Sequence, residues 1–180
     1  MNRHPGHRRL VLVRHAKAAW PNGVPDRNRP LSGKGRRNAH AAGEWFLREG
    51  PLPEIVLCSD AVRARQTWEI IASALIRPPR LRCLPDLYLA EPDDLLRAVH
   101  RLDEGIQTAA VVGHEPTMSS TALLLAGRGS SPADVNRIVS KYPTSGIAVL
   151  RFDGPWKSLS AGTAALESFS VPRAACGGRA

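Results

Sequence analysis

The sequence has few cysteines, few aromatic residues and no long apolar run, and each shortage excludes a class of protein. The three cysteines are an odd number without a close pair, so neither a disulfide framework nor a cysteine metal site is expected. The six histidines also lack the spacing of metal ligands. No apolar run approaches the roughly 20 residues of a membrane span. We therefore expect a protein without a metal, a cofactor or a membrane partner.

Lysine is scarce as well, because the 25 basic residues comprise 21 arginines and 4 lysines. The formal charge of +9 favours anionic partners such as phosphorylated molecules, acidic protein surfaces or nucleic acid. The basic residues are scattered, and few aromatic residues lie between them, which disfavours a nucleic-acid surface. The first apolar run is too short for a signal peptide, so a cytoplasmic location is expected.

Strand-like apolar runs alternate with helical patterns along the chain. This alternation predicts an α/β fold, a three-layer sandwich with a mostly parallel central sheet flanked by helices. Residues 1–9 are predicted to be a basic tail, 10–160 the single domain, and 161–180 a partly irregular tail with a short edge strand near 168–171. The predicted strands cover about 10–13, 54–58, 80–84, 108–113, 146–152 and 156–159, and the predicted helices about 32–49, 60–76, 92–102, 116–126 and 132–141.

Basic side chains follow the predicted strands at their carboxyl ends. The aliphatic run 10–13 leads directly into Arg14 and His15, and His114 directly follows another predicted strand. Arg63 lies in the first turn of the helix after the second strand. Ligands bind at this edge of open α/β sheets. Arginine offers a fork of donors that matches phosphate, and histidine is a nucleophile or proton carrier near neutral pH.

The charge of Arg63 is unusual for its position. A cation near a helix N-terminus is disfavoured by roughly 0.3–1 kcal/mol, and a bound anion reverses this penalty. Taken alone, Arg63 is better explained as a solvent-facing side chain, and a single histidine after a strand is more often structural than catalytic. The combination of these residues at one sheet edge instead predicts a phosphate site.

Four segments resemble the motifs of the histidine phosphatase superfamily, also called the phosphoglycerate mutase-like superfamily. Residues 12–16 resemble its R-H-G/A signature, and 29–35 are similar to its R-P-L-(S/T)-x-x-G segment. Residues 59–67 resemble S-x-x-x-R-A-x-Q-T, and 112–116 resemble V-G/S-H-x-P. The segments occur in the family's order. The short chain, the His-Ala-Lys sequence after the arginine and the lack of a large inserted cap most resemble the SixA-type phosphohistidine phosphatases.

The resemblance implies a metal-independent hydrolase in which His15 attacks phosphorus and becomes a phosphohistidine. Arg14 and Arg63 would clamp the phosphoryl oxygens, His114 would complete the positive pocket, and water would hydrolyse the intermediate. Ser32 is a further candidate for substrate binding, as is the 144–145 pair, although a helix cap or a turn is the favoured role for each.

The general acid is the role without a clear residue. Relatives that act on phosphate esters use a carboxylic acid to protonate the leaving oxygen. Glu91 is the candidate here, although helix capping is its favoured role, and a surface role is favoured for Glu115. A phosphoramidate needs less help from an acid, because its imidazole leaving group can depart already protonated. The sequence therefore favours phosphohistidine as the substrate, carried by a phosphorylated protein.

Three other functions were weighed. One is a small-molecule phosphomonoesterase of the same superfamily, with a phosphorylated metabolite as its partner. Another is a non-catalytic phosphoryl or nucleic-acid binding protein, which the presence of both His15 and His114 disfavours. A cysteine phosphatase needs a Cys-x5-Arg loop, and only four residues separate Cys58 from Arg63. Cys58 is therefore predicted to be a small buried residue.

Overall fold

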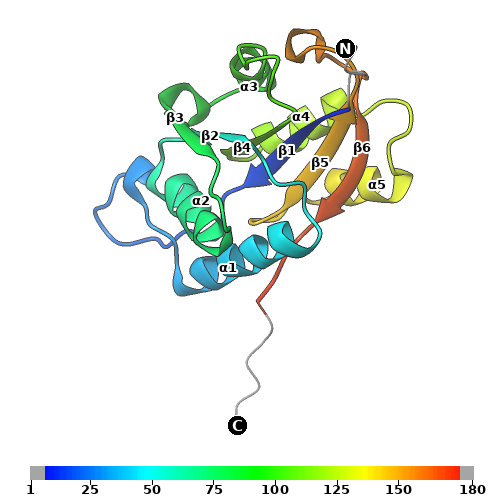
Figure 1. Cartoon of the computed structure of the whole chain (residues 1–180). Coiled ribbons are helices and arrows are strands. Elements are labelled where there is room, and N and C mark those ends of the chain that lie inside the picture. Colours follow the sequence, from blue (N-terminus) through cyan, green and yellow to red (C-terminus); the bar gives the residue numbers. More distant parts are fainter. Residues whose placement is uncertain (1–6, 175–180) are drawn as a thin grey trace.

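The computed structural model describes residues 7–174, and a six-stranded sheet forms its centre (Figure 1). The strand order is β3-β2-β4-β1-β5-β6. The neighbours from β3 to β1 pair in parallel, and β5 runs antiparallel to both β1 and β6. The predicted α/β fold with a mostly parallel sheet is confirmed. The strands are β1 (Arg8–Arg14), β2 (Ile55–Ser59), β3 (Arg80–Leu84), β4 (Thr108–Gly113), β5 (Ile147–Phe152) and β6 (Ala165–Ser170).

Helices cover both faces of the sheet and complete the three layers (Figure 1). Helices α1 and α2 pack on one face through Phe46 and Trp68, which belong to the same buried cluster as Val11 and Val13 of the sheet. Helices α3, α4 and α5 pack on the other face, which carries Leu10 and other alternate strand residues. The helices are α1 (Gly33–Arg48), α2 (Val62–Ala74), α3 (Pro92–Val99), α4 (Thr117–Leu125) and α5 (Pro132–Ser140), with short 3-10 turns η1 (Asp26–Asn28), η2 (Pro85–Leu87) and η3 (Trp156–Ser158).

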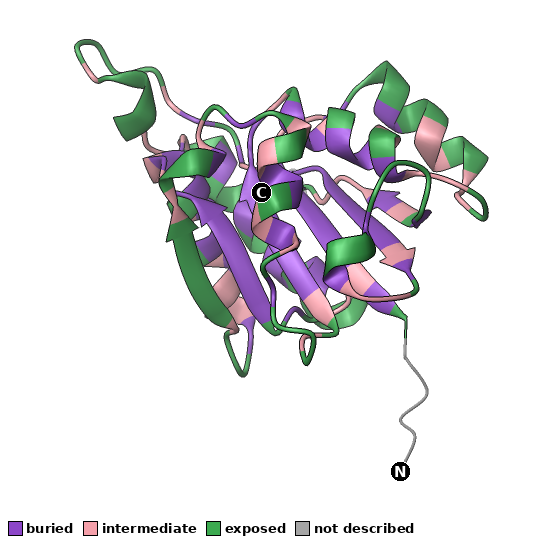
Figure 2. Ribbon diagram, turned by 90° about the horizontal axis from the view of Figure 1, so that it is seen from above, coloured by how far each residue is buried: buried purple, intermediate pink, exposed green. Residues whose placement is uncertain are grey.

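The burial of the strands explains their sequence. The central strands β1, β2, β4 and β5 are almost entirely buried, so they are continuous apolar runs without polar alternation (Figure 2). Strand β3 lies at the edge and is exposed along most of its length, and it carries Arg80 and Arg82. Charged side chains on an edge strand disfavour pairing with another chain.

Both ends of the domain differ from the prediction. The predicted tail 1–9 is wrong at Arg8 and Arg9, which belong to β1. Arg8 is buried, and its guanidinium donates to the carbonyls of Glu104 (2.7 Å) and Ile106 (3.3 Å), which are acceptors that satisfy its N–H groups. Residues 1–6 and 175–180, which complete the two predicted tails, lie outside the described residues.

The predicted strand at 156–159 is also wrong, since the segment forms η3. Trp156 is fully buried there, and its indole Nε1 donates to the carbonyl of Ile106 (2.9 Å). The partner of β5 is instead β6, which is longer than the predicted edge strand and begins earlier, at Ala165. Its apolar residues Leu166 and Phe169 join the core, which fixes its register.

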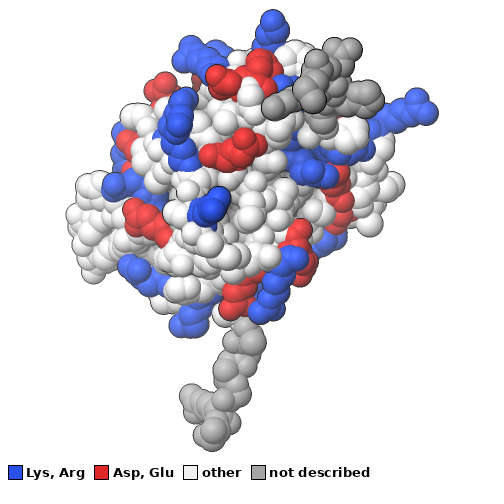
Figure 3. Space-filling view, viewed as in Figure 1, with Lys and Arg blue, Asp and Glu red and all other residues white. Residues whose placement is uncertain are grey.

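The surface mixes both signs of charge. Lysine and arginine side chains alternate with aspartate and glutamate over the face seen in Figure 3. Many arginines pair with carboxylates, as Arg9 does with Glu167 at 2.8 Å. Within residues 7–174, none of the helices combines the length and the apolar character needed to span a bilayer.

Candidate active site

The sheet topology brings the two predicted imidazoles together. Strands β1 and β4 are parallel neighbours, with Arg14 opposite Gly113 in the register. His15 and His114 therefore leave the sheet side by side at its carboxyl edge, and the backbone N–H of His15 donates to the carbonyl of Gly113 (3.0 Å). The centroids of the two imidazole rings are 5.0 Å apart.

His15 is oriented by its own backbone. Its Nδ1 lies 2.7 Å from the carbonyl oxygen of Ala16, which is an acceptor, so Nδ1 carries the proton and donates it. The other ring nitrogen, Nε2, keeps its lone pair and lies 3.3 Å from Nε of Arg63. Burial, together with the neighbouring His114, Arg63 and Arg14, lowers the pKa of His15 to about 3. The His15 imidazole is therefore neutral near pH 7, with the lone pair of Nε2 free.

Arg63 lies in the first turn of α2, as predicted, and its side chain is only 7% exposed. It does not face solvent, because its guanidinium donates to the carbonyl (2.6 Å) and to carboxylate Oδ2 (3.0 Å) of Asp26. The hydroxyl of Thr67, one turn later, donates to the carbonyl of Arg63 (2.6 Å) and accepts from the backbone N–H of Ala16 (3.0 Å). Helix α2 thus holds both Arg63 and the segment that carries His15.

Asp26 is a site residue that the sequence reasoning missed. Its carboxylate accepts hydrogen bonds from the hydroxyl of Tyr88 (2.6 Å), from Arg29 (2.7 Å) and from Arg63. The bonds from Tyr88 and Arg29, together with the positive charge of Arg63, lower the pKa of Asp26 below its ordinary value. The signal was weak, because Asp26 lies in an irregular segment, three residues before the Arg29 of a family motif.

His114 is held by the last residue of β2. Its Nε2 lies 2.8 Å from the hydroxyl of Ser59, and its ring packs in a T-shaped arrangement with Tyr88, with the ring centroids 5.7 Å apart. Burial, together with the positive charge of Arg63, lowers the pKa of His114 to about 4. The ring is thus neutral near pH 7 in the structure, and a bound anion would raise its pKa.

Several buried donors at this edge have no partner. Nε of Arg14, Nδ1 of His114 and the hydroxyl of Ser145 are three of the five buried, unpaired side-chain atoms in residues 7–174. Arg14 is anchored by a bond from its NH1 to the carbonyl of Tyr142 (2.5 Å). The backbone N–H of Ser145 is 3.2 Å from the carbonyls of Arg14 and His15, which brings Ser145 beside them. An unpaired buried polar group costs about 1–3 kcal/mol, and an anion would satisfy these donors.

The remaining candidates have local roles in the structure. Ser32 caps α1: its hydroxyl accepts from the N–H of Gly35 (3.1 Å) and donates to the carbonyl of Lys17 (2.9 Å). Glu91 is the exposed N-cap of α3, and its N–H donates to Asp94 Oδ2 (2.9 Å). Ser32 and Glu91 form no hydrogen bond with the arginines and imidazoles of the site among the described residues. The roles predicted for Ser32 in substrate binding and for Glu91 as a general acid stay predictions.

Glu115 and Cys58 also have other surroundings. The carboxylate of Glu115 accepts from the backbone N–H (3.0 Å) and hydroxyl (2.6 Å) of Ser119. Cys58 is fully buried, and burial raises the pKa of its thiol, so it is not a reactive thiolate. In the part of the chain that the structure describes, no three histidine, cysteine or acidic side chains gather as metal ligands.

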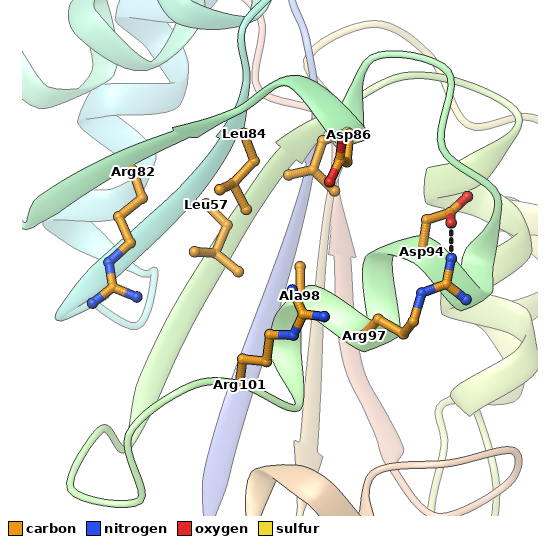
Figure 4. A pocket seen from close by; sticks show the side chains of 9 residues that line it. Leu57, Arg82, Leu84, Asp86, Asp94, Arg97, Ala98 and Arg101 are labelled. Atoms are coloured by element: carbon orange, nitrogen blue, oxygen red, sulfur yellow. Dashed lines mark hydrogen bonds and ion pairs between the residues drawn. The ribbon is translucent and has the colours of Figure 1, made fainter.

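A separate cleft lies between β3 and α3 (Figure 4). Its volume is about 220 Å³, and its floor is apolar, with Leu57, Leu84 and Ala98. Arginine and aspartate side chains share its rim, where Arg97 pairs with Asp94. The residues that line it do not include the two imidazoles, so this cleft is not the catalytic site.

Comparisons with known proteins identify a family and several relatives. A family model described as the histidine phosphatase superfamily (branch 1) matches residues 10–87. The uncharacterized protein Rv1276c of Mycobacterium tuberculosis is 45% identical over 162 residues, which is 89% of this chain and all of the relative. The uncharacterized protein ML1117 of Mycobacterium leprae is 41% identical over 165 residues, again 89% of this chain and all of the relative.

Solved structures of SixA proteins have the same fold. A protein described as the phosphohistidine phosphatase SixA of Nakamurella multipartitia superposes with a TM-score of 0.81 at 32% identity, over 93% of this chain and 97% of the other. Its counterpart from Agrobacterium tumefaciens superposes with a TM-score of 0.76 at 30% identity, over 92% of this chain and 98% of the other. A protein histidine phosphatase SixA complexed with tungstate superposes with a TM-score of 0.74 at 25% identity, over 91% of this chain and 97% of the other. The motifs, the fold and these relatives together establish that the chain belongs to the histidine phosphatase superfamily.

Proposed function

We propose that the chain is a SixA-type protein phosphohistidine phosphatase that works through a covalent phosphohistidine on His15. The observation that carries this proposal is the imidazole of His15, whose Nδ1 is fixed by Ala16 and whose Nε2 lies beside Arg63. The neighbouring His114 ring and the unpaired Nε of Arg14 complete a site that can hold a phosphoryl group. The proposed partner is a cytoplasmic protein that carries phosphohistidine.

In the first step, Nε2 of His15 attacks phosphorus in line, and the bond between phosphorus and the substrate imidazole breaks. A substrate ring that is protonated on its second nitrogen leaves as neutral histidine. The guanidinium groups of Arg14 and Arg63 stabilise the charge on the phosphoryl oxygens, and His114 adds a donor. The positive charge needed for transfer comes from these side chains, so the proposed reaction uses no metal ion.

The second step returns the enzyme to its starting state. Phosphorylated His15 is cationic because Nδ1 keeps the proton that it donates to Ala16. Water attacks phosphorus, the bond to Nε2 breaks, and neutral His15 departs while the water protons remain with phosphate or solvent. Neither step needs a carboxylic acid. This agrees with the cap position of Glu91 and with the bonds that Ser119 donates to the carboxylate of Glu115.

The SixA structures support the proposal. The one with tungstate is a protein histidine phosphatase with a tetrahedral oxyanion, and it covers most of this chain. The substrate class is carried over from these relatives as part of the proposal. Within this chain, the unpaired donors of Arg14, His114 and Ser145 offer an oxyanion several hydrogen bonds.

The test compares a phosphohistidine peptide, an aryl phosphate and a panel of sugar phosphates with the purified protein. We expect hydrolysis of the peptide, and an acid-labile phosphate on His15 when the reaction is quenched rapidly. His15→Ala should lower the rate by about 10³-fold or more while the circular dichroism spectrum is unchanged. His40→Ala is the matched control, because His40 is an exposed histidine on α1. Efficient cleavage of sugar phosphates with no action on phosphohistidine would overturn the proposal in favour of a small-molecule phosphomonoesterase.

A further inference from the structure

Three of the four lysines of the chain lie in one pocket at the catalytic edge of the sheet. Lys17, Lys34 and Lys141 line a pocket of about 360 Å³ together with Arg14 and Arg173. They come from three separate parts of the sequence: the segment after β1, the first turn of α1, and the C-terminal cap of α5. In a chain with so few lysines, this clustering sets the pocket apart from the rest of the surface.

The positive charges in this lysine pocket are not compensated. Its lining includes no acidic residue, and none of the four lysine and arginine side chains besides Arg14 forms an ion pair among the described residues. The cleft between β3 and α3 differs, because Asp86 and Asp94 share its rim with the arginines. Uncompensated like charges repel one another, and an anion would relieve that repulsion.

The position of Lys34 strengthens this argument. Lys34 is the second residue of α1, whose first turn contains no acidic residue. A cation at this end of a helix is opposed by the helix dipole, as with Arg63 in α2, and a bound anion removes that opposition. An anion beside Lys34 is therefore favoured for the same physical reason as an anion beside Arg63.

Arg14 connects the lysine pocket to the catalytic imidazoles. It directly precedes His15 in the chain, and it also lines the lysine pocket. The far wall of the pocket is held in place, because Arg173 donates to the carbonyl of Thr144 (3.0 Å) and Asn38 accepts from the N–H of Ala174 (3.4 Å). A substrate whose phosphoryl group contacts Arg14 would thus reach the pocket with a neighbouring group.

We propose that the lysine pocket binds a second anionic group on the same substrate molecule, next to the phosphoryl group that is transferred. This inference rests on the proposed function and narrows its substrate class to phosphohistidine flanked by a carboxylate or a second phosphate. Lys34 and Lys141 determine the preference for that group, and they do so through charge at a distance from the reacting atoms.

The test uses three phosphohistidine peptides that differ at one flanking position, which is glutamate, glutamine or phosphoserine. We expect the wild-type protein to prefer the glutamate or phosphoserine peptide over the glutamine peptide by about tenfold in kcat/KM, mainly through KM. The better of the two anionic peptides identifies the source of the second anion. The double variant Lys34→Gln with Lys141→Gln should reduce this preference to about twofold or less.

Lys157→Gln is the matched control, because Lys157 is the remaining lysine, is exposed in η3, and does not line the pocket. It should keep the full preference. Equal kcat/KM values for all three peptides in the wild-type protein would overturn the inference, as would an equal loss of preference in Lys157→Gln and in the double variant. The second outcome would mean that net charge alone is responsible.

A failure of the proposed function would look different. If no phosphohistidine peptide is hydrolysed, the same variants are compared on aryl phosphates with and without a ring carboxylate. A carboxylate preference that the double variant loses would keep the lysine pocket while the phosphohistidine substrate is rejected. Hydrolysis of the peptides without any preference for an anionic neighbour would keep phosphohistidine as the substrate and reject the proposed role of the lysine pocket.

Discussion

At the scale of single residues, the imidazoles of His15 and His114 are buried and lie close to arginine side chains. His15 and His114 have pKa values lowered to about 3 and about 4, chiefly by burial. The same burial that keeps the His15 imidazole neutral therefore makes its protonation costly in the folded protein. Stability and, in the proposed mechanism, catalysis consequently depend on pH through the same two groups.

The free energy of unfolding should fall as the pH drops from about 6.5 toward 4. In this range the unfolded chain binds protons at His15 and His114, whereas the folded chain does not, so acid favours unfolding. Each histidine contributes a slope of up to about 1.4 kcal/mol per pH unit. Urea titrations at pH 7, 6 and 5 measure the slope. His114→Gln should make it shallower, and a slope that is unchanged in this variant would contradict the assignment.

We expect the small side chain of Thr67 to contribute strongly to the free energy of unfolding. Its hydroxyl is fully buried and joins the N–H of Ala16 to the carbonyl of Arg63. Thr67→Val keeps the shape but leaves the N–H of Ala16 unpaired, so we expect a loss of about 1–3 kcal/mol in the free energy of unfolding. Thr67→Ser retains the hydroxyl and should recover most of it. Equal stability of the valine and serine variants would show that the bond contributes little.

At the scale of elements, the start of α1 packs closely on the segment after β1. A Cβ atom added at Gly35 would lie 2.1 Å from the carbonyl oxygen of Lys17, far inside van der Waals contact. That carbonyl also accepts from the hydroxyl of Ser32. The helix and the catalytic segment are therefore in direct backbone contact, and a side chain at this position must push them apart.

Gly35→Ala should destabilise the protein by about 1–3 kcal/mol and also lower kcat, because the displaced segment carries His15. Gly33→Ala is the matched control on the same helix turn: the nearest atom to its new Cβ is Arg37 NH1 at 3.7 Å, an ordinary contact. It should be neutral or stabilise by up to about 1 kcal/mol, since alanine favours helix. Thermal melts and steady-state kinetics measure both variants. Similar behaviour of the two would contradict the close contact.

The elements also show what the sequence could predict. Strand β4 has the predicted bounds, because an apolar run of small and β-branched residues ends at Gly113. The apolar stripe of α2, including Trp68 and Ile71, is buried as its spacing indicates. Segment 156–159 was misread because Trp156 is buried by a 3-10 turn, and apolar spacing over four residues does not distinguish a turn from a strand.

The site was predictable where a side chain directly follows a strand. Arg14, His15 and His114 are placed by the parallel register of β1 and β4, which the alternating pattern implies. Asp26 and Tyr88 were missed, because they meet through tertiary contacts between two irregular segments. No period or propensity connects such segments, so only the folded chain reveals that they hold Arg63.

At the scale of the whole molecule, the net charge of +9 should speed the binding of an anionic substrate. Exposed charges attract an anionic substrate less strongly as salt shortens the Debye length from about 30 Å at 0.01 M to about 8 Å at 0.15 M. We expect kcat/KM for a phosphorylated substrate to fall several-fold over this range, with little change in kcat. Steady-state kinetics in NaCl measure both. A fall in kcat alone would contradict capture as the step affected.

Because β5 runs in the reverse direction, the two ends of the sheet have different roles, one in the candidate active site and the other in stability. Because β5 runs against β1, the turn that contains Ser145 reaches the rim where β1 ends, and η3 with Trp156 closes the opposite rim. Arg8 and Trp156 both bond to the carbonyl of Ile106 there, far along β1 from His15. Substitutions near Trp156 should therefore lower the amount of folded protein in the cell. Substitutions near Ser145 should instead lower the activity of each folded molecule.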